Sequence, residues 1–329
     1  MDSNGDRKQS SVRDAVFGAV DVETLLGAGY DQFASLLARE QSGPMAVVGP
    51  PYSGRERVLD VATDRLDARS VRLGPGADGS AVLDNLGDGP LIVGGCHHLY
   101  ERRVDGFDPL MTVLDALSEV DTTVVTGWNS TAWAYLDAIW SVERSFPMTV
   151  EIQPLDTETI TIAIEAAGDV PTYRRPDPGD RPLFRSYPIG WRDYEIPIPI
   201  PDRLVRSFGT ETDAQAAVFQ QVQSVANGNL GVADALVQRL SGEQVYPGDV
   251  TPIGADLDID ADERFALRLL VGSELADRST LAEIVGSRPE PLLGRLAREG
   301  VVTIDGDHVS LEPAAVPTAT ATVNRGRIL

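Results

Sequence analysis

Apolar residues in the first half of the chain follow two alternating patterns. Short apolar runs are separated by longer segments in which apolar positions return every three or four residues, as on one face of a helix. The runs predict strands at 45–48, 70–73, 91–93, 122–126 and 148–152, and the longer segments predict helices at 21–40, 55–66, 81–86, 106–119, 131–142 and 156–167. Strands alternating with helices predict an α/β fold, a parallel sheet with helices on both faces.

The pattern changes after residue 168. Eight of the 22 prolines lie in residues 171–208, and the run 196–201 must be extended because proline fixes φ and restricts the residue before it. Helical periodicity returns at 212–226 and 231–240. We therefore predict a helical lid with a proline-rich insertion.

The last 70 residues have the pattern of a winged helix-turn-helix. Residues 262–273 and 289–299 have the pattern of amphipathic helices. Between these two helices, Thr280 and Glu283 form a capping box that predicts the start of a third, short helix. Two short strands follow, at 301–304 and 308–311, joined by Asp-Gly-Asp, which is a hairpin signal.

These patterns divide the chain into consecutive parts. We expect a mobile polar tail at 1–20, the α/β domain at 21–168, the lid at 169–245 with its insertion at 171–208, a linker at 246–260, the winged helix at 261–312 and a tail at 313–329. The final tail either adds a strand to a sheet edge or is disordered.

Charge changes how partners can be predicted. Lysine and arginine total 28 against 50 acidic residues, which gives a net charge of −22, and the pI is near 4.4. We interpret this as the acidic surface of a protein from a high-salt, haloarchaeal cytoplasm. A basic domain is the usual sign of nucleic-acid binding, so net charge cannot exclude that function here.

The remaining composition points to the cytoplasm. Cys96 is the sole cysteine, which excludes an intrachain disulfide and favours a reducing compartment. The N-terminus lacks an apolar signal core, and no run of about 18 apolar residues could span a bilayer.

Residues 49–56 have the frame of a phosphate-binding loop, G-x-x-x-x-G-K-[ST], but Arg55 and Glu56 replace its last two residues. In a working loop, backbone N–H groups cradle phosphate, the lysine reaches the β/γ-oxygens and the hydroxyl holds Mg²⁺. Lys8 is the only lysine of the chain. The candidate nucleotide-binding residues are Gly49, Ser53, Gly54, Arg55, Glu56 and, by the resemblance below, Asn129.

Further segments resemble parts of P-loop ATPases. Residues 91–100 look like a Walker B strand in which Gly94 and Gly95 replace the two acids, and Asn129 fits the polar sensor 1 position of the AAA+ and STAND groups. The turn 228–231 resembles the start of their sensor 2 helix, although Asp234 lies near the slot of the expected arginine. With the winged helix, residues 30–312 resemble archaeal AAA+/STAND-type ATPases of the Orc/Cdc6 class.

These departures argue against ATP hydrolysis. Magnesium would lose its hydroxyl ligand and its carboxylate partner, and phosphoryl transfer depends on such positioning and charge neutralisation. A carboxylate is favoured at a helix N-terminus, so we expect Glu56 to occupy the anion site itself. Of three interpretations, an empty loop kept for folding ranks above nucleotide binding without turnover, which ranks above hydrolysis.

The segment 96–98, Cys-His-His, invites a metal interpretation. Consecutive residues on a strand point to opposite faces, so we expect a polar strand end and no metal site. Core or inter-domain packing explains the aromatic residues Trp128, Trp133, Tyr135 and Trp140 more simply than base stacking does.

Two segments are candidate binding surfaces. Arginines and aromatic residues interleave over 171–208, including Arg174, Arg175 and Trp191, and suit a nucleic acid or a protein interface. The alternative is an insertion that packs its aromatics on the lid. Arg288, Arg295 and Arg298 lie on or beside the recognition helix of the winged helix and could reach phosphates or guanine edges, with Glu290 and Glu299 among them. Winged helices also serve as protein–protein modules, so DNA is only slightly favoured over a protein partner.

Our hypothesis is a catalytically degenerate AAA+/STAND-like regulator or scaffold, not an enzyme, that binds DNA or a protein partner and needs no cofactor. One alternative is a nucleotide-gated switch, in which Arg55, Asn129 and the loop backbone hold ATP or ADP without cleaving it. A second is a weak ATPase that uses Glu56. A homo-oligomer is compatible with each.

Overall fold

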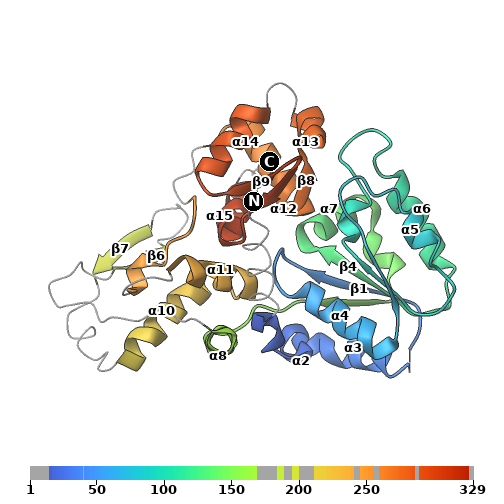
Figure 1. Ribbon diagram of the computed structural model, residues 1–329, viewed down its shortest axis with the longest axis horizontal. Coiled ribbons are helices and arrows are strands. Elements are labelled where there is room, and N and C mark those ends of the chain that lie inside the picture. The colour runs from blue at the N-terminus through green and yellow to red at the C-terminus, as the bar shows by residue number, and fades with distance from the viewer. Residues whose placement is uncertain are drawn as a thin grey trace.

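The computed structural model describes residues 15–39, 41–168, 184–188, 195–199, 211–240, 245–254, 259–285 and 289–325. Its centre is a five-stranded sheet in the order β2-β3-β4-β1-β5, with every neighbouring pair parallel (Figure 1). The strands are β1 (Pro44–Gly49), β2 (Arg69–Arg72), β3 (Leu91–Gly94), β4 (Val124–Asn129) and β5 (Met148–Glu151). The predicted α/β fold with a parallel sheet is confirmed.

Helices cover both faces of this sheet, because the side chains of β1 alternate between them. Met45 and Val47 join one apolar cluster, and Ala46 and Val48 join the other. The first face carries α2 (Val22–Leu26), α3 (Tyr30–Leu37), α4 (Arg55–Leu66) and α8 (Thr157–Ala167); the second carries α5 (Ser80–Leu83), α6 (Asp108–Ser118) and α7 (Ser130–Trp140). The helix predicted at 21–40 is interrupted by the 3₁₀ turn η1 (Gly27–Gly29).

The lid consists of two helices, α10 (Glu211–Ala226) and α11 (Leu230–Leu240), which pack on each other and on α8. Within the insertion, β6 (Phe184–Pro188) and β7 (Glu195–Pro199) form an antiparallel pair, so the extended conformation predicted for the proline-rich run holds for its described part. Arg174, Arg175 and Trp191 lie outside the described residues.

The C-terminal part has the element order of a winged helix. It consists of α12 (Ala261–Ser273), β8 (Leu275–Asp277), α13 (Arg278–Val285), α14 (Pro289–Arg298), β9 (Val302–Asp305) and β10 (His308–Leu311). The strands form a sheet in the order β8-β10-β9. The predicted capping box is wrong, because α13 begins two residues before Thr280; the box that exists joins Asp260 and Glu263 at the start of α12.

Both terminal segments differ from expectation where they are described. Residues 15–20, assigned to the mobile tail, bury Val16 and Val20 in the core. The C-terminal segment forms η5 (Pro313–Ala315) and α15 (Val316–Arg325), which packs along α12 with Ala319 and Val323 buried. Small and β-branched residues gave it a strand-like or featureless pattern, but they suit close helix contact.

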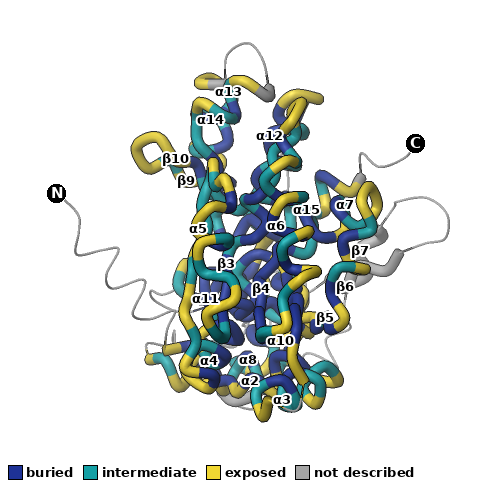
Figure 2. Tube along the Cα trace, turned by 90° about the vertical axis from the view of Figure 1, so that its right-hand side faces the viewer, coloured by how far each residue is buried: buried dark blue, intermediate teal, exposed yellow. Residues whose placement is uncertain are grey.

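One apolar cluster runs through all three parts of the molecule. Val58 of α4, Leu236 of α11 and Leu267 of α12 belong to it, and so do Val250 and Ile259 of the predicted linker. Figure 2 shows the buried residues continuing from the sheet into the lid and the C-terminal part. Within the described ranges, no helix combines the length and apolar character needed to cross a membrane.

Candidate functional site

The loop between β1 and α4 follows the backbone course that its glycines permit. Gly54 has φ 100°, a conformation that side chains disfavour, and a Cβ atom there would lie 3.0 Å from the Phe17 ring. A Cβ on Gly49 would lie 2.7 Å from Ile152 and from Ser53 Oγ. Ser53 donates its hydroxyl hydrogen to Pro50 O at 2.8 Å, so it is bound within the loop.

Arg55, in the lysine position, is buried at the start of α4 with 5% of its side chain exposed. Its Nη1 donates to Gly49 O at 3.2 Å, and its Nη2 lies 2.9 and 3.1 Å from the two carboxylate oxygens of Glu274. Burial alone would lower the pKa of Arg55, but the neighbouring Glu274 and Glu56 raise it above its usual value. The guanidinium is therefore a buried cation held by a carboxylate from the C-terminal part.

Glu274 lies at the C-terminal end of α12, just before β8, with φ 64° and ψ −41°. Such a conformation is rare for a residue with a side chain and costs about 1–3 kcal/mol. Burial raises the pKa of its carboxyl group, but Arg55, and to a smaller degree His97 and Asn129, hold that pKa below the usual value. The backbone strain places a charged carboxylate against Arg55.

Asn129, the sensor 1 candidate, ends β4 and is fully buried. Its Oδ1 accepts from the N–H groups of Thr131 and Ala132 and so caps α7, while its Nδ2 donates to Glu274 Oε1 and to Val271 O, both at 2.9 Å. The side chain thus joins the sheet edge to α12. Arg55 and Asn129, both candidate nucleotide-binding residues, lie close together, and the group between them is the Glu274 side chain.

His97 completes the surroundings of Glu274. Residues Cys96–His98 form a 3₁₀ turn, η2, and not the strand end that we predicted. His97 Nδ1 accepts from the Asn129 N–H at 3.3 Å, and Nε2 lies 3.9 Å from Glu274 Oε1. Burial lowers the pKa of His97 to about 3, so its ring is neutral at pH 7. Among the described residues, no group of three or more potential metal ligands converges.

Glu56 does not occupy the anion site as predicted. Its carboxylate forms an ion pair with Arg72 and lies 3.7 Å from Arg55 Nε, with 45% of the side chain exposed. Arg72, on the edge strand β2, also contacts Asp60 at 2.7 Å and so draws Glu56 along the surface of α4. Helix periodicity could not reveal Arg72 as its partner, because their contact depends on the sheet order.

The lid and the C-terminal part both contact the loop between β1 and α4. Asn229 Nδ2 donates to Pro51 O at 2.8 Å, and the Gly231 N–H donates to Tyr52 O at 3.1 Å. The Tyr52 hydroxyl donates to Leu311 O at the end of β10, at 2.7 Å. Asp234, near the expected sensor 2 position, is buried and accepts from Gln238 Nε2. The loop therefore contacts both the lid and the C-terminal part.

Of the candidate partner-binding arginines, the structure describes Arg295 and Arg298, which lie on α14 and not at this site. Arg295 lies on α14 and contacts Glu263 at 3.3 Å, while Arg298 is exposed at the end of the same helix. Arg288 lies outside the described residues. Of the aromatic residues predicted to pack, Trp128 of β4 and Trp133 are buried and meet each other and Phe146 edge-on or tilted. Tyr135 is partly buried, and Trp140 is 48% exposed, so core packing does not hold for Trp140.

No protein-family model matches the chain. Among curated proteins, it is 26% identical over 186 residues to ribose-5-phosphate isomerase A of Haloarcula marismortui, a stretch that covers 54% of this chain and 71% of the isomerase. That identity does not place the chain in the isomerase family.

Among solved structures, the fold is similar to the Thermotoga maritima RuvB Holliday junction branch migration motor, with TM-score 0.41, 13% identity, and coverage of 92% of this chain and 95% of that one. It is also similar to the Aeropyrum pernix Orc1 protein in complex with DNA, with TM-score 0.45, 14% identity, and coverage of 96% and 98%. TM-scores below 0.5 carry no functional argument.

Proposed function

We propose that the chain is a P-loop protein of the AAA+/STAND kind that does not turn nucleotide over and acts as a regulator or scaffold. One observation carries the proposal: the Glu274 carboxylate accepts a hydrogen bond from Arg55 Nη2 and another from Asn129 Nδ2, both at 2.9 Å. Both groups are the polar side chains that would reach a nucleotide phosphate in this fold. They hold a carboxylate of the same chain instead.

The chemistry of the neighbouring positions supports this proposal. Glu56 stands where a hydroxyl would ligate Mg²⁺, and Gly94 at the end of β3 provides no carboxylate to order the ion. Phosphoryl transfer relies on that metal and on positioned charge. An entering nucleotide would also have to displace Glu274 from a partly buried ion pair, which is costly when one partner is left alone.

A protein partner fits the C-terminal part better than DNA does. Residues 260–312 hold eleven acidic residues against six arginines. On the described surface, Arg295 is paired with Glu263 and Arg278 with Glu290, so two cations near the recognition helix α14 are already neutralised. A duplex phosphate backbone binds through uncompensated cations, and a protein partner does not need them. DNA binding is the other outcome that the experiment must allow.

The first experiment titrates ATP–Mg²⁺ and ADP calorimetrically into the full chain and into Glu274→Gln. The proposal expects no saturable heat with the unaltered chain and no phosphate release from either protein. Glu290→Gln, an exposed acid on α14, is the matched control. Micromolar binding by the unaltered chain would instead support the nucleotide-gated switch, and phosphate release that disappears in Glu56→Ala would support the weak ATPase.

A second experiment separates the two partner classes. Fluorescence anisotropy with random and A·T-rich duplexes, at two salt concentrations, measures DNA binding by the unaltered chain and by Arg298→Ala. The proposal expects no salt-dependent binding. Saturable binding weakened by Arg298→Ala would assign α14 to DNA and reject the preference for a protein partner.

A further inference from the structure

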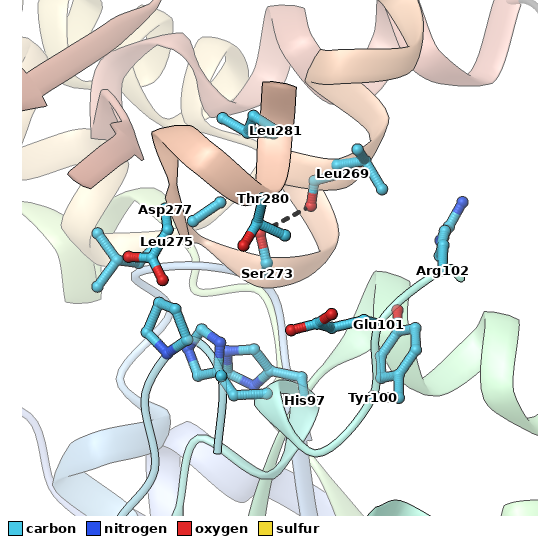
Figure 3. Close-up of a pocket in the computed structure, with 14 residues that line it drawn as sticks. His97, Tyr100, Glu101, Arg102, Leu269, Ser273, Leu275, Asp277, Thr280 and Leu281 are labelled. Carbon is cyan, nitrogen blue, oxygen red and sulfur yellow. Dashed lines mark hydrogen bonds between the residues drawn. The ribbon is translucent and has the colours of Figure 1, made fainter. Parts of the chain in front are cut away.

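A pocket lies on the seam between the α/β domain and the C-terminal part, beside the ion pair of Arg55 and Glu274 (Figure 3). One wall comes from the residues after β3, including His97, His98 and Glu101, and the other comes from α12, β8 and α13. Ser273 and Leu275, the two neighbours of Glu274, both line it. Nothing in the proposed function uses this pocket.

Three charged residues line this pocket, the carboxylates Glu101 and Asp277 and the guanidinium of Arg102. Figure 3 shows Glu101 reaching in beneath Ser273 and Asp277 standing on the opposite side, while the Arg102 side chain extends away from them. The Arg102 guanidinium lies 3.9 Å from the centre of the Tyr135 ring, a cation–π contact outside the pocket. The Arg102 guanidinium is therefore turned away from the two carboxylates.

Both carboxylates have one oxygen committed and one oxygen available. Glu101 Oε2 pairs with Arg103, and Asp277 Oδ1 pairs with His308 Nδ1 at 2.8 Å. In the part of the chain that the structure describes, Glu101 Oε1 and Asp277 Oδ2 accept no hydrogen bond. A donor entering between them would therefore find one carboxylate oxygen as an acceptor on each side.

The remaining lining is uncharged. Burial lowers the pKa of His97 to about 3 and that of His98 to about 4, so both imidazoles are neutral at pH 7 and add no repulsion against a cation. The Thr280 hydroxyl supplies another acceptor. Leu269, Leu275 and Leu281 form an apolar part of the wall, on which the methylene groups of a ligand could pack.

We propose that this pocket binds a small organic cation, an aliphatic amine or guanidinium whose charged end lies between Glu101 and Asp277 and whose methylenes pack on the leucines. An inorganic divalent cation fits less well, because the described residues bring no three metal ligands together. An anion would meet two carboxylates. Since residues from both sides of the seam form the pocket, the bound cation would hold the C-terminal part against the α/β domain.

The test titrates 1,4-diaminobutane calorimetrically into the full chain at constant ionic strength, with 1,4-butanediol as the uncharged isostere. We expect saturable binding of the diamine and none of the diol. Glu101→Gln and Asp277→Asn should each weaken binding about tenfold or more, the usual effect of losing a charged hydrogen-bond partner. Glu23→Gln, an exposed acid on α2 outside this pocket, should leave it unchanged.

Thermal unfolding without ligand shows whether the variants are folded, so a loss of binding with an unchanged melting temperature supports the site. The site is further supported if the diamine raises the melting temperature of the unaltered chain and of Glu23→Gln but not of the two pocket variants. Equal binding of diol and diamine, unaltered binding by both pocket variants, or no saturation would overturn the proposal. Binding abolished equally by K⁺ would reassign the pocket to a monovalent ion and reject the organic cation.

Discussion

Arg55 Nη2 lies 2.9 Å from Glu274 Oε1, although 219 residues separate the two in sequence. The contact joins the first helix turn after the phosphate loop to the helix end of the C-terminal part. Hydrogen bonds orient both side chains of this pair. Arg55 donates to Gly49 O, and Glu274 accepts from Asn129 Nδ2. The ion pair is therefore part of a connected polar network at a domain seam.

Removing one partner of this pair should destabilise the protein strongly. Glu274→Ala removes the hydrogen-bonded carboxylate of the buried Arg55 guanidinium and leaves only Glu56, 3.7 Å from its Nε. We expect a loss of about 2–4 kcal/mol in the free energy of unfolding, at or below the usual cost because Glu274 is 18% exposed. Urea unfolding measures it. The double variant Arg55→Met/Glu274→Met should be more stable than Glu274→Ala; equal stability would contradict the role of the stranded charge.

Acid should weaken the seam through two groups whose pH ranges overlap. The pKa of His97 is lowered to about 3, so the unfolded chain binds its proton near pH 6.5 while the folded chain does not. Stability is therefore complete above pH 6.5 and falls below it, by about 2 kcal/mol at pH 5 from His97 alone. The contribution of Glu274, whose pKa is also lowered, is lost only below its ordinary value near 4.5.

Urea unfolding at pH 7 and pH 5 tests this. His97→Gln should lose less stability between the two values than the unaltered chain does. An equal loss would assign the acid sensitivity to other groups.

Replacing Gly231 by alanine, which adds only a methyl group, should destabilise the protein. Its Cβ would press into Tyr52 O and lie 2.9 Å from Tyr52 Cβ, where the lid meets the loop. We expect Gly231→Ala to cost about 1–3 kcal/mol. The matched control is Gly294→Ala in α14, where a Cβ meets nothing within 4 Å and a gain of about 0.5–1 kcal/mol is expected. Similar melting temperatures for the two variants would contradict close lid packing.

The two glycines at the end of β3 should differ in the same way. A Cβ on Gly94 would have its nearest neighbour, Glu56 Oε2, at 3.5 Å, whereas Gly95 has φ 74° and a Cβ there would collide with Leu73 O. Gly94→Ala should be tolerated, and Gly95→Ala should lower the melting temperature by several degrees. The reverse order would be inconsistent with this turn. The geometry thus opposes restoring an acid at position 95.

Local sequence signals predicted the helices and strands but not the side-chain contacts between them. Asp156 caps α8 as its position predicted, and the α4 bounds match. By contrast, Glu56, an acid favoured at a helix start, was predicted to occupy the anion site, and no partner within the chain was predicted for Arg55. Sheet order put Arg72 beside Glu56, and tertiary packing brought in Glu274, whose helix-end position carries no signal in a single sequence.

The separation of Arg55 and Glu274 also has a consequence during translation. At roughly 5–20 residues per second, 219 residues take about 10–40 s to synthesise. Through that interval the α/β domain, whose strands all precede residue 152, can fold with its phosphate loop facing solvent or a chaperone. The Arg55 guanidinium of a newly made chain therefore lacks the Glu274 carboxylate that it contacts in the finished protein.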